Sequence, residues 1–160
     1  MTRWSIPRSA DTAVVVAAEP EQVYAVITDV TRIAEWSHEC RRARWLGDTT
    51  DPVVGGRFQG TNTVNRFSWS RTCTITALEP GRLFAYRTSG GRPADSTAWS
   101  FELEPVEGGT RVTQRYEILE FARWAELLTI AFVPAHRHRG DALRADLVRL
   151  GHVAGSARTT

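Results

Sequence analysis

The residues best suited to bind a small molecule are polar side chains that alternate with aromatic ones along expected β-strands. Between residues 57 and 118, alternate positions share one face, which collects the rings of Phe58, Phe67, Trp69, Trp99 and Phe101 with the polar groups of Asn62, Arg71, Gln114 and Tyr116. Burying an amide or a guanidinium group costs several kcal/mol unless it finds a partner. These groups therefore favour a wet pocket, in which the rings contact a flat or greasy ligand and Asn62, Gln114 and Tyr116 orient its oxygen atoms.

The same residues also fit an ordinary core, and this alternative stays open. The rings would then fill the interior, and the polar groups would lie near strand ends in contact with solvent. Arg71 is the residue whose assignment to the pocket is weakest, because one β-bulge would turn its side chain outward into solvent. A core that only needed filling would carry few polar atoms, so the pocket is the interpretation we favour.

A second group of residues surrounds Trp36, on the expected connection between a helix and the following strand. Either flanking carboxylate, Glu35 or Glu39, could act as a general base if burial raised its pKa toward neutrality. The arginines at positions 41, 42 and 44 offer a simpler explanation, because exposed glutamates beside them would form surface ion pairs. We favour the ion pairs, and we keep Trp36 and Trp45 as ring positions of the expected pocket.

His136 and His138 resemble a metal motif, but their spacing argues against one. Two residues apart on a helix, they point about 200 degrees away from each other, which is poor ligand geometry. We therefore expect no metal, and the lack of a phosphate-binding loop predicts no cofactor. No Gly-x-Ser-x-Gly motif supports a hydrolase triad. His136 continues the apolar stripe of the last helix, so it either caps the pocket as a hydrogen-bonding group or lies partly exposed in the first turn.

These residues need a scaffold, and its organising element is a helix expected over residues 134–154. Gly140, Leu143, Leu147 and Leu150 recur at three- and four-residue spacing and so form one buried face, with Leu143 among the pocket residues. Pro134 fits the first turn of this helix, and Gly151 fits a left-handed cap at its end.

The segments before this helix alternate mostly with period two, which indicates strands. A β-branched strand is expected over residues 11–18, followed by two short helices at 20–30 and 29–36. Six further strands follow, near residues 41–45, 57–63, 67–77, 82–89, 97–103 and 112–118. Such a run of strands predicts a seven-stranded antiparallel sheet. The fold class is therefore α+β, with the sheet curled around the last helix.

Length and composition predict one domain. A chain of 160 residues with 42% hydrophobic content can bury one core, and we expect a lead at residues 1–10, the domain at 11–154 and a tail at 155–160. The net charge is +2, and the 20 basic residues are all arginine, scattered rather than clustered, which argues against nucleic-acid binding. Two cysteines without a signal peptide indicate a reducing cytoplasm. The apolar run at residues 127–134 is shorter than the ~20 residues of a membrane-spanning helix.

Residues 121–133 form a segment that fits neither a strand nor the last helix. Large apolar side chains crowd into it, at Phe121, Trp124, Leu127, Leu128, Ile130 and Phe132. It has three candidate roles: a lid over the pocket, a contact in a homodimer, or packing that seats the last helix. Packing is the role we favour.

Short motifs along the chain resemble those of one protein family. They are Glu19-Pro20-Glu21-Gln22-Val23-Tyr24, Thr28-Asp29-Val30, Glu35-Trp36-Ser37, Arg44-Trp45-Leu46, Gly56-Arg57-Phe58-Gln59-Gly60, the segment Leu78 to Phe84, and Gly109-Thr110-Arg111-Val112-Thr113. In this order and spacing, from about residue 12 to residue 153, the sequence resembles the START-like (SRPBCC) superfamily in its bacterial polyketide cyclase/dehydrase and lipid-transport branch. Similar sequences commonly read Trp-Ser-Pro-Glu where this chain has His38 in place of the proline.

The resemblance implies a helix-grip fold, in which a seven-stranded antiparallel sheet curls around a long C-terminal helix. It also implies a cavity for a hydrophobic or aromatic small molecule between them, but it does not decide between binding and catalysis. The favoured function is binding or transport of a lipid, polyketide or isoprenoid-like ligand. One alternative is a polyketide aromatase/cyclase, in which Tyr116, Arg71 or a glutamate polarises or deprotonates the substrate. The other is a protein-interaction module.

Overall fold

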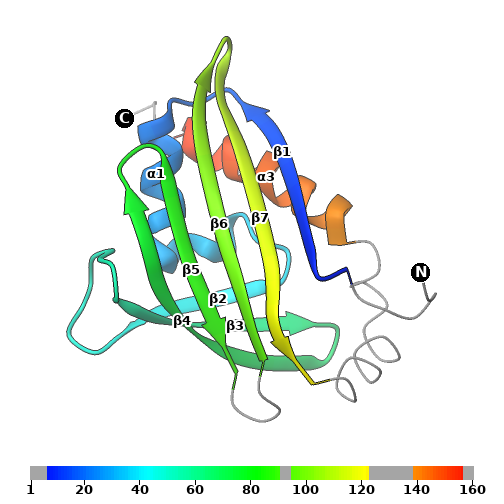
Figure 1. Ribbon diagram of the computed structural model, residues 1–160. Helices are drawn as coiled ribbons and strands as arrows, with labels where there is room; N and C mark the ends of the chain where they lie inside the picture. The colour runs from blue at the N-terminus through cyan, green and yellow to red at the C-terminus, as the bar shows by residue number, and fades with distance from the viewer. Residues whose placement is uncertain (1–6, 91–94, 123–138, 157–160) are drawn as a thin grey trace.

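The protein folds as a curled sheet that holds one long helix in its concave side (Figure 1). The computed structural model describes residues 7–90, 95–122 and 139–156. They form a seven-stranded antiparallel sheet, two short helices between its first two strands, and a C-terminal helix. The α+β class, the helix-grip arrangement and the order of elements predicted from the sequence are confirmed.

The seven strands form one open sheet in the order β1-β7-β6-β5-β4-β3-β2. Consecutive strands from β2 to β7 are neighbours, and β1 closes the series by pairing with β7. Their bounds are β1 Ser9–Val16, β2 Cys40–Leu46, β3 Arg57–Val64, β4 Phe67–Glu79, β5 Leu83–Ser89, β6 Asp95–Val106 and β7 Gly109–Phe121. The first strand lies two residues earlier than the predicted 11–18.

The two helices between β1 and β2 are α1, Pro20–Thr28, and η1, Val30–Glu35. Pro20 stands in the first turn of α1, where its missing N–H costs no hydrogen bond. The side chain of Asp29 accepts a hydrogen bond from the backbone N–H of Thr31 and so caps η1. Both short helices were predicted, and their buried apolar residues belong to the main apolar cluster.

The alternation predicted for β2 is wrong at its start. A strict period of two places Cys40 on the face opposite Ala43, yet both are buried. The register with β3 shifts between Cys40 and Arg42, which is a β-bulge. One extra residue in the strand turns Cys40 inward and leaves Arg41 exposed.

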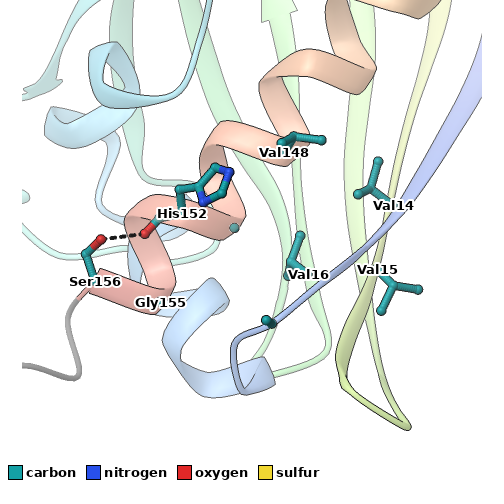
Figure 2. A pocket seen from close by; sticks show the side chains of 9 residues that line it. Val14, Val15, Val16, Val148, His152, Gly155 and Ser156 are labelled. Atoms are coloured by element: carbon teal, nitrogen blue, oxygen red, sulfur yellow. Dashed lines mark hydrogen bonds between the residues drawn. The ribbon is translucent and has the colours of Figure 1, made fainter.

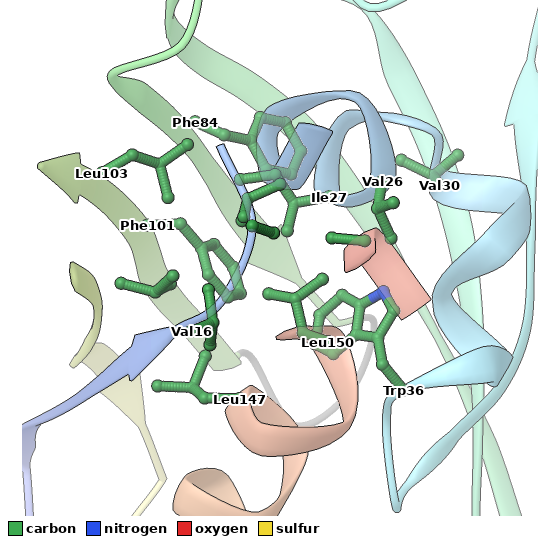
Figure 3. Packing of buried hydrophobic residues seen from close by; sticks show 14 of the residues in the cluster. Val16, Val26, Ile27, Val30, Trp36, Phe84, Phe101, Leu103, Leu147 and Leu150 are labelled. Carbon is green, nitrogen blue, oxygen red and sulfur yellow. The ribbon is translucent and has the colours of Figure 1, made fainter. Parts of the chain in front are cut away.

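The apolar core lies between the concave face of the sheet and α3, Arg139–Ser156 (Figure 3). Leu147 and Leu150 of α3 are fully buried against Phe101 of β6 and Ile27 of α1. Burying a side chain of this size contributes about 1.5–3 kcal/mol, so this cluster is a main source of stability. The predicted helix spanned residues 134–154; positions 134–138 lie outside the described residues, and the helix continues two residues further, to Ser156.

The predicted cap at Gly151 is wrong, because α3 runs straight through this residue. A Cβ atom added at Gly151 would lie 2.5 Å from Cγ1 and 2.6 Å from Cβ of Val16. Glycine is therefore required here by the close approach of α3 to β1 rather than by the end of the helix.

Replacing Gly151 tests this close approach. The substitution Gly151→Ala should lower the free energy of unfolding by about 1–3 kcal/mol, because the added methyl group forces α3 away from Val16. Urea denaturation followed by circular dichroism would measure the change. Gly140→Ala is the matched control, since a Cβ there would meet nothing within 4 Å in the same helix. Equal stability of both variants would contradict the packing argument.

Candidate functional site

A row of aromatic side chains crosses the concave face of the sheet. The ring centroids of Tyr116 and Trp99 are 5.4 Å apart, and those of Trp99 and Tyr86 are 6.5 Å apart with the planes only 17° from parallel. Tyr86 in turn contacts Phe58 at 5.4 Å, and Phe58 contacts Trp45 at 6.0 Å. We call these five residues the aromatic band. The aromatic band runs from β7, β6 and β5 to β3 and then to β2, the strand at the edge of the sheet.

The register of the sheet produces the aromatic band. Tyr116 of β7 is directly opposite Trp99 of β6, which is directly opposite Tyr86 of β5. Directly opposed residues on one face lie close enough for their rings to interact. Tyr86 was not among the predicted site residues, although the alternation of Phe84, Tyr86 and Thr88 carried the signal. Burial raises the pKa of Tyr86 well above its usual value, so its hydroxyl stays protonated.

A second set of rings belongs to the dry core. Phe84 contacts both Tyr86 and Phe101, and the edge of Trp36 meets Phe101 with centroids 5.8 Å apart. Trp36 and Phe101 are 5% and 1% exposed and pack in the main apolar cluster. The structure thus places these two predicted pocket residues in the core. Phe58 of the aromatic band, 2% exposed, belongs to the same apolar cluster, and Leu143 of α3 is buried as well.

Arg139, the first residue of α3, covers one end of the aromatic band. Its guanidinium carbon lies 5.5 Å from the ring centre of Trp99 and 5.2 Å from that of Tyr116. These distances fit cation–π contacts with both rings. Its Nη2 atom also lies 4.0 Å from Oε2 of Glu39. Nothing in the sequence pattern singled out Arg139 from its neighbours, because only the curl of the sheet brings β6 and β7 under the start of α3.

The predicted polar residues divide between two places. Gln114 and Tyr116 lie next to the aromatic band on β7; Gln114 is 4% exposed, and the hydroxyl of Tyr116 donates a hydrogen bond to the backbone oxygen of Pro7 at 3.3 Å. Asn62 lies on β3, four residues after Phe58 and on the same face of the sheet; it is paired with Trp69 of β4, and both are half-buried.

Arg71 remains in register with Gly60, because the bulge of β4 falls between Ile75 and Ala77. Its Nη2 atom donates to Oδ2 of Asp95 at 2.5 Å. The predicted residue His136 lies outside the described residues, as do residues 123–133 of the segment 121–133.

The two candidate general bases have cationic partners. Glu35 accepts two hydrogen bonds of 2.8 Å from Arg32 and is exposed, and these bonds hold its pKa below the usual value. A carboxylate with a lowered pKa is a poor proton acceptor, so these contacts favour the ion-pair interpretation of Glu35 over the catalytic one. The ion pair itself was predicted, although its partner is Arg32 rather than an arginine of β2. Glu39 lies beside Arg139, as described above.

A buried carboxylate on α3 organises a network that sequence reasoning missed. Asp146 is 3% exposed, and its Oδ2 atom lies 2.7 Å from Nδ1 of His38. Its Oδ1 atom accepts hydrogen bonds from the backbone N–H of His38 and from the side chain of Arg149. Arg149 also donates through Nε to the backbone oxygen of Trp36 at 3.0 Å. The hydrogen bond to Asp146 is the main cause of a raised pKa at His38.

The position of Asp146 could have signalled this network. It stands three residues after Leu143 and four before Leu150, on the stripe predicted to be buried. A carboxylate at such a position requires hydrogen-bonding or cationic partners. His38 departs from the motif that the sequence otherwise resembles, but no sequence pattern links it to a residue 108 positions away.

Two of the hollows in the structure are lined by described residues. The larger of these two, of about 350 Å³, is a groove between the edge strand β1 and α3, where Val14, Val16 and Val148 lie near His152 (Figure 2). The other, of about 190 Å³, is a cleft lined by His38, Glu39, Arg41, Thr63, Val64, Asn65 and Arg139. Only the cleft adjoins the aromatic band, through Arg139. The cavity predicted between sheet and α3 stays a prediction.

The described residues contain few other reactive groups. Cys40 and Cys73 are buried free thiols, and burial raises the pKa of Cys73 to about 12, so neither is suited to act as a nucleophile. Over residues 7–90, 95–122 and 139–156, no group of three or more His, Cys, Asp or Glu residues could hold a metal ion. In the same ranges, no helix has the length and apolar character needed to cross a membrane.

Comparison with known proteins places this fold and sequence among relatives. The family model for polyketide cyclase / dehydrase and lipid transport matches residues 7–149. The structure of protein MLL2253 from Mesorhizobium loti has a TM-score of 0.69 at 17% identity and covers 96% of this chain and 99% of its own. The Polyketide_cyc-like protein Cgl2372 from Corynebacterium glutamicum has a TM-score of 0.51 at 26% identity, covering 99% and 92%.

A third similar structure is the di-domain ARO/CYC StfQ from the steffimycin biosynthetic pathway. Its TM-score is 0.69 at 13% identity, and the match covers 93% of this chain but 49% of StfQ, so the chain corresponds to about half of that protein. No curated protein matches the chain. At these identities the solved structures support the fold.

The pairing of His38 with Asp146 predicts a pH-dependent contribution to stability. Because the folded-state pKa of His38 is raised, its stabilising effect is complete below the unfolded pKa of about 6.5 and is lost as pH rises through the folded-state pKa. The difference in unfolding free energy between wild type and His38→Asn should therefore shrink as pH rises from about 6 to 9. Urea denaturation at several pH values would measure it.

His152→Asn is the control for this experiment, because His152 is exposed and lies on α3 six residues after Asp146, on a different face of the helix. This variant should keep the pH dependence of the wild type. Parallel curves for wild type and His38→Asn would show that the ion pair contributes nothing.

Proposed function

Because the chain belongs to the polyketide cyclase/dehydrase and lipid transport family, we propose that it binds a flat, largely apolar small molecule against the aromatic band. Trp99, Tyr116 and Tyr86 offer ring surfaces that favour planar or conjugated ligands. The family covers both carriers and cyclases by its own description, so the distinction has to come from the side chains of this chain.

The observation that carries the proposal is the side chain of Gln114. Its Oε1 atom is buried and has no hydrogen-bond partner among the described residues. Leaving a buried acceptor unpaired costs about 1–3 kcal/mol. Gln114 is next to Tyr116 along the buried face of β7, where a bound hydroxyl group would satisfy it. Two other buried atoms, Nε1 of Trp36 and Oδ1 of Asp95, also lack partners, but neither residue belongs to the aromatic band.

The division of the concave face supports the same conclusion. Towards α1, the face is filled by Phe84, Phe101 and Leu103 against α3, which leaves a dry and closely packed region. At the β6 and β7 end of the aromatic band, polar groups adjoin the rings: Arg139 packs over Trp99 and Tyr116, and Gln114 stands two residues before Tyr116 on β7. Rings combined with a few fixed polar groups are typical of small-molecule sites, whereas a core needs no such groups.

Binding is better supported than cyclase chemistry. A polyketone cyclase needs a group that removes or donates a proton at the ligand. The groups proposed for that role have other partners. Glu35 is bound to Arg32, and Glu39 lies beside Arg139. Arg71 is bound to Asp95, and the hydroxyl of Tyr116 donates to Pro7. The StfQ likeness keeps a polyketide among the ligand classes to test, without requiring a reaction.

The direct test is native mass spectrometry of the purified protein, followed by denaturing extraction. A reproducible extra mass that is released as an aromatic or lipid compound would support binding. Titration with 2-naphthol, a flat ring with one hydroxyl group, should quench tryptophan fluorescence through Trp99. A protein of apo mass whose fluorescence does not respond to 2-naphthol would contradict the proposal.

Gln114→Leu should separate stability from binding. Removing the unpaired acceptor should raise the free energy of unfolding of the ligand-free protein by about 1 kcal/mol. We expect wild-type protein to bind 2-naphthol about tenfold more tightly than 2-methoxynaphthalene, which lacks the donor proton. Gln114→Leu should abolish this difference in affinity. Fluorescence titration of both ligands measures the preference.

Gln59→Leu is the matched control, because Gln59 lies on β3 where its side chain accepts a hydrogen bond from exposed Arg44. It should leave the preference between the two naphthalenes unchanged. A preference that survives Gln114→Leu would show that Gln114 does not contact the ligand.

A further inference from the structure

The cleft beside the aromatic band has an unbalanced set of charges. Three of its lining residues are basic, His38, Arg41 and Arg139, and one is acidic, Glu39. The remaining lining residues, Thr63, Val64 and Asn65, come from the end of β3 and the turn after it. A concave site with more cationic than anionic groups attracts an anion.

His38 is held in one orientation by the protein. Its Nδ1 atom faces Oδ2 of Asp146 at 2.7 Å, and its backbone N–H donates to Oδ1 of the same carboxylate at 2.9 Å. Asp146 is itself buried and bound by Arg149. With Nδ1 occupied, Nε2 is the ring nitrogen left to act toward the cleft, and the side chain is 36% exposed. This is how a carboxylate commonly orients a functional imidazole.

Arg139 connects the cleft to the aromatic band. Its guanidinium group packs over Trp99 and Tyr116, and the same group lines the cleft. Its distance of 4.0 Å from Glu39 is beyond hydrogen-bond length, so this ion pair is a loose one. A ligand lying along the rings would therefore meet a positive group at the end where the cleft begins.

We propose that the cleft binds the carboxylate of an amphipathic acid, with His38 and Arg139 as its cationic partners and the aromatic band as the contact for its apolar part. This inference rests on the proposed function, because it assigns the polar end of the same ligand. The site selects acids over neutral lipids of equal length.

The charges around His38 favour the protonated form of its ring. Asp146 raises its pKa through the hydrogen bond and through charge, and Glu39 adds to this effect. Burial and the charge of Arg149 oppose it. Arg139 and Arg41 are the other charged residues lining the cleft. A protonated ring donates a charge-assisted hydrogen bond from Nε2, which is stronger than a neutral one.

The test compares cis-parinaric acid, a fluorescent conjugated fatty acid, with its methyl ester. The acid should bind wild-type protein about tenfold more tightly than the ester at pH 6, and the difference should fall as pH rises and His38 loses its proton. Equal binding of acid and ester would overturn the carboxylate site while leaving the proposed function standing. Failure of both, together with failure of 2-naphthol, would overturn the proposed function and this inference with it.

Variants separate a binding role from a structural one. His38→Asn keeps a donor near Asp146 but removes Nε2 and the charge, so it should lose most of the preference for the acid and keep the affinity for the ester. Glu39→Gln should strengthen binding of the acid, because it removes the competing carboxylate beside Arg139. A network that only braces the fold would not produce effects of opposite sign.

Arg44→Gln provides the control for loss of one positive charge. Arg44 lies on β2 with its side chain bound to Gln59 and does not line the cleft. It should leave the preference for acid over ester unchanged. A loss of preference equal to that of His38→Asn would show that the effect is one of net charge, and would overturn the assignment to His38.

Discussion

The buried carboxylate of Asp146 is the interaction on which the other parts of the structure depend. A carboxyl group with 3% exposure is tolerated only when its oxygens have hydrogen-bonding partners. His38 engages one oxygen, and the backbone of His38 together with Arg149 engages the other. Arg149 also donates to the backbone oxygen of Trp36. Asp146 therefore holds the connection between η1 and β2 against α3, both directly through His38 and through Arg149. Removing one partner of such a buried group typically costs about 3–5 kcal/mol.

The second constraint is the close approach of α3 to β1 at Gly151, which fixes where the helix lies in the curled sheet. Leu147 and Leu150 then fill the region beside Phe101, and the start of the helix lies at the other end, where Arg139 reaches Trp99 and Tyr116. One helix thereby closes the dry core and contributes a cation to the aromatic band. The position of α3 therefore determines both where the apolar core lies and where a positive charge meets the aromatic band.

The sequence predicts the fold well because its signals are local and repeated. Period two identifies six strands after the helices, and the stripe through Leu143, Leu147 and Leu150 identifies the helix that they enclose. The predicted face of a strand is wrong where one extra residue breaks the period, as at the bulge near Cys40. The predicted end of a helix is wrong where a glycine is needed for a tertiary contact and not for a cap, as at Gly151. Neither a bulge nor a close approach leaves a mark in the spacing of apolar residues.

The site was harder to predict, since its contacts join residues far apart in the chain. Alternation found Trp99, Gln114 and Tyr116, but it gave no reason to choose Arg139 or to pair His38 with Asp146. Asp146 nevertheless carried a usable signal, because a carboxylate on a buried stripe must have a partner elsewhere. The group that compensates it, His38, donates to one oxygen of Asp146 through its backbone N–H and faces the other through Nδ1 of its ring. The buried charge and the histidine therefore depend on each other, and the cationic cleft follows from that pair.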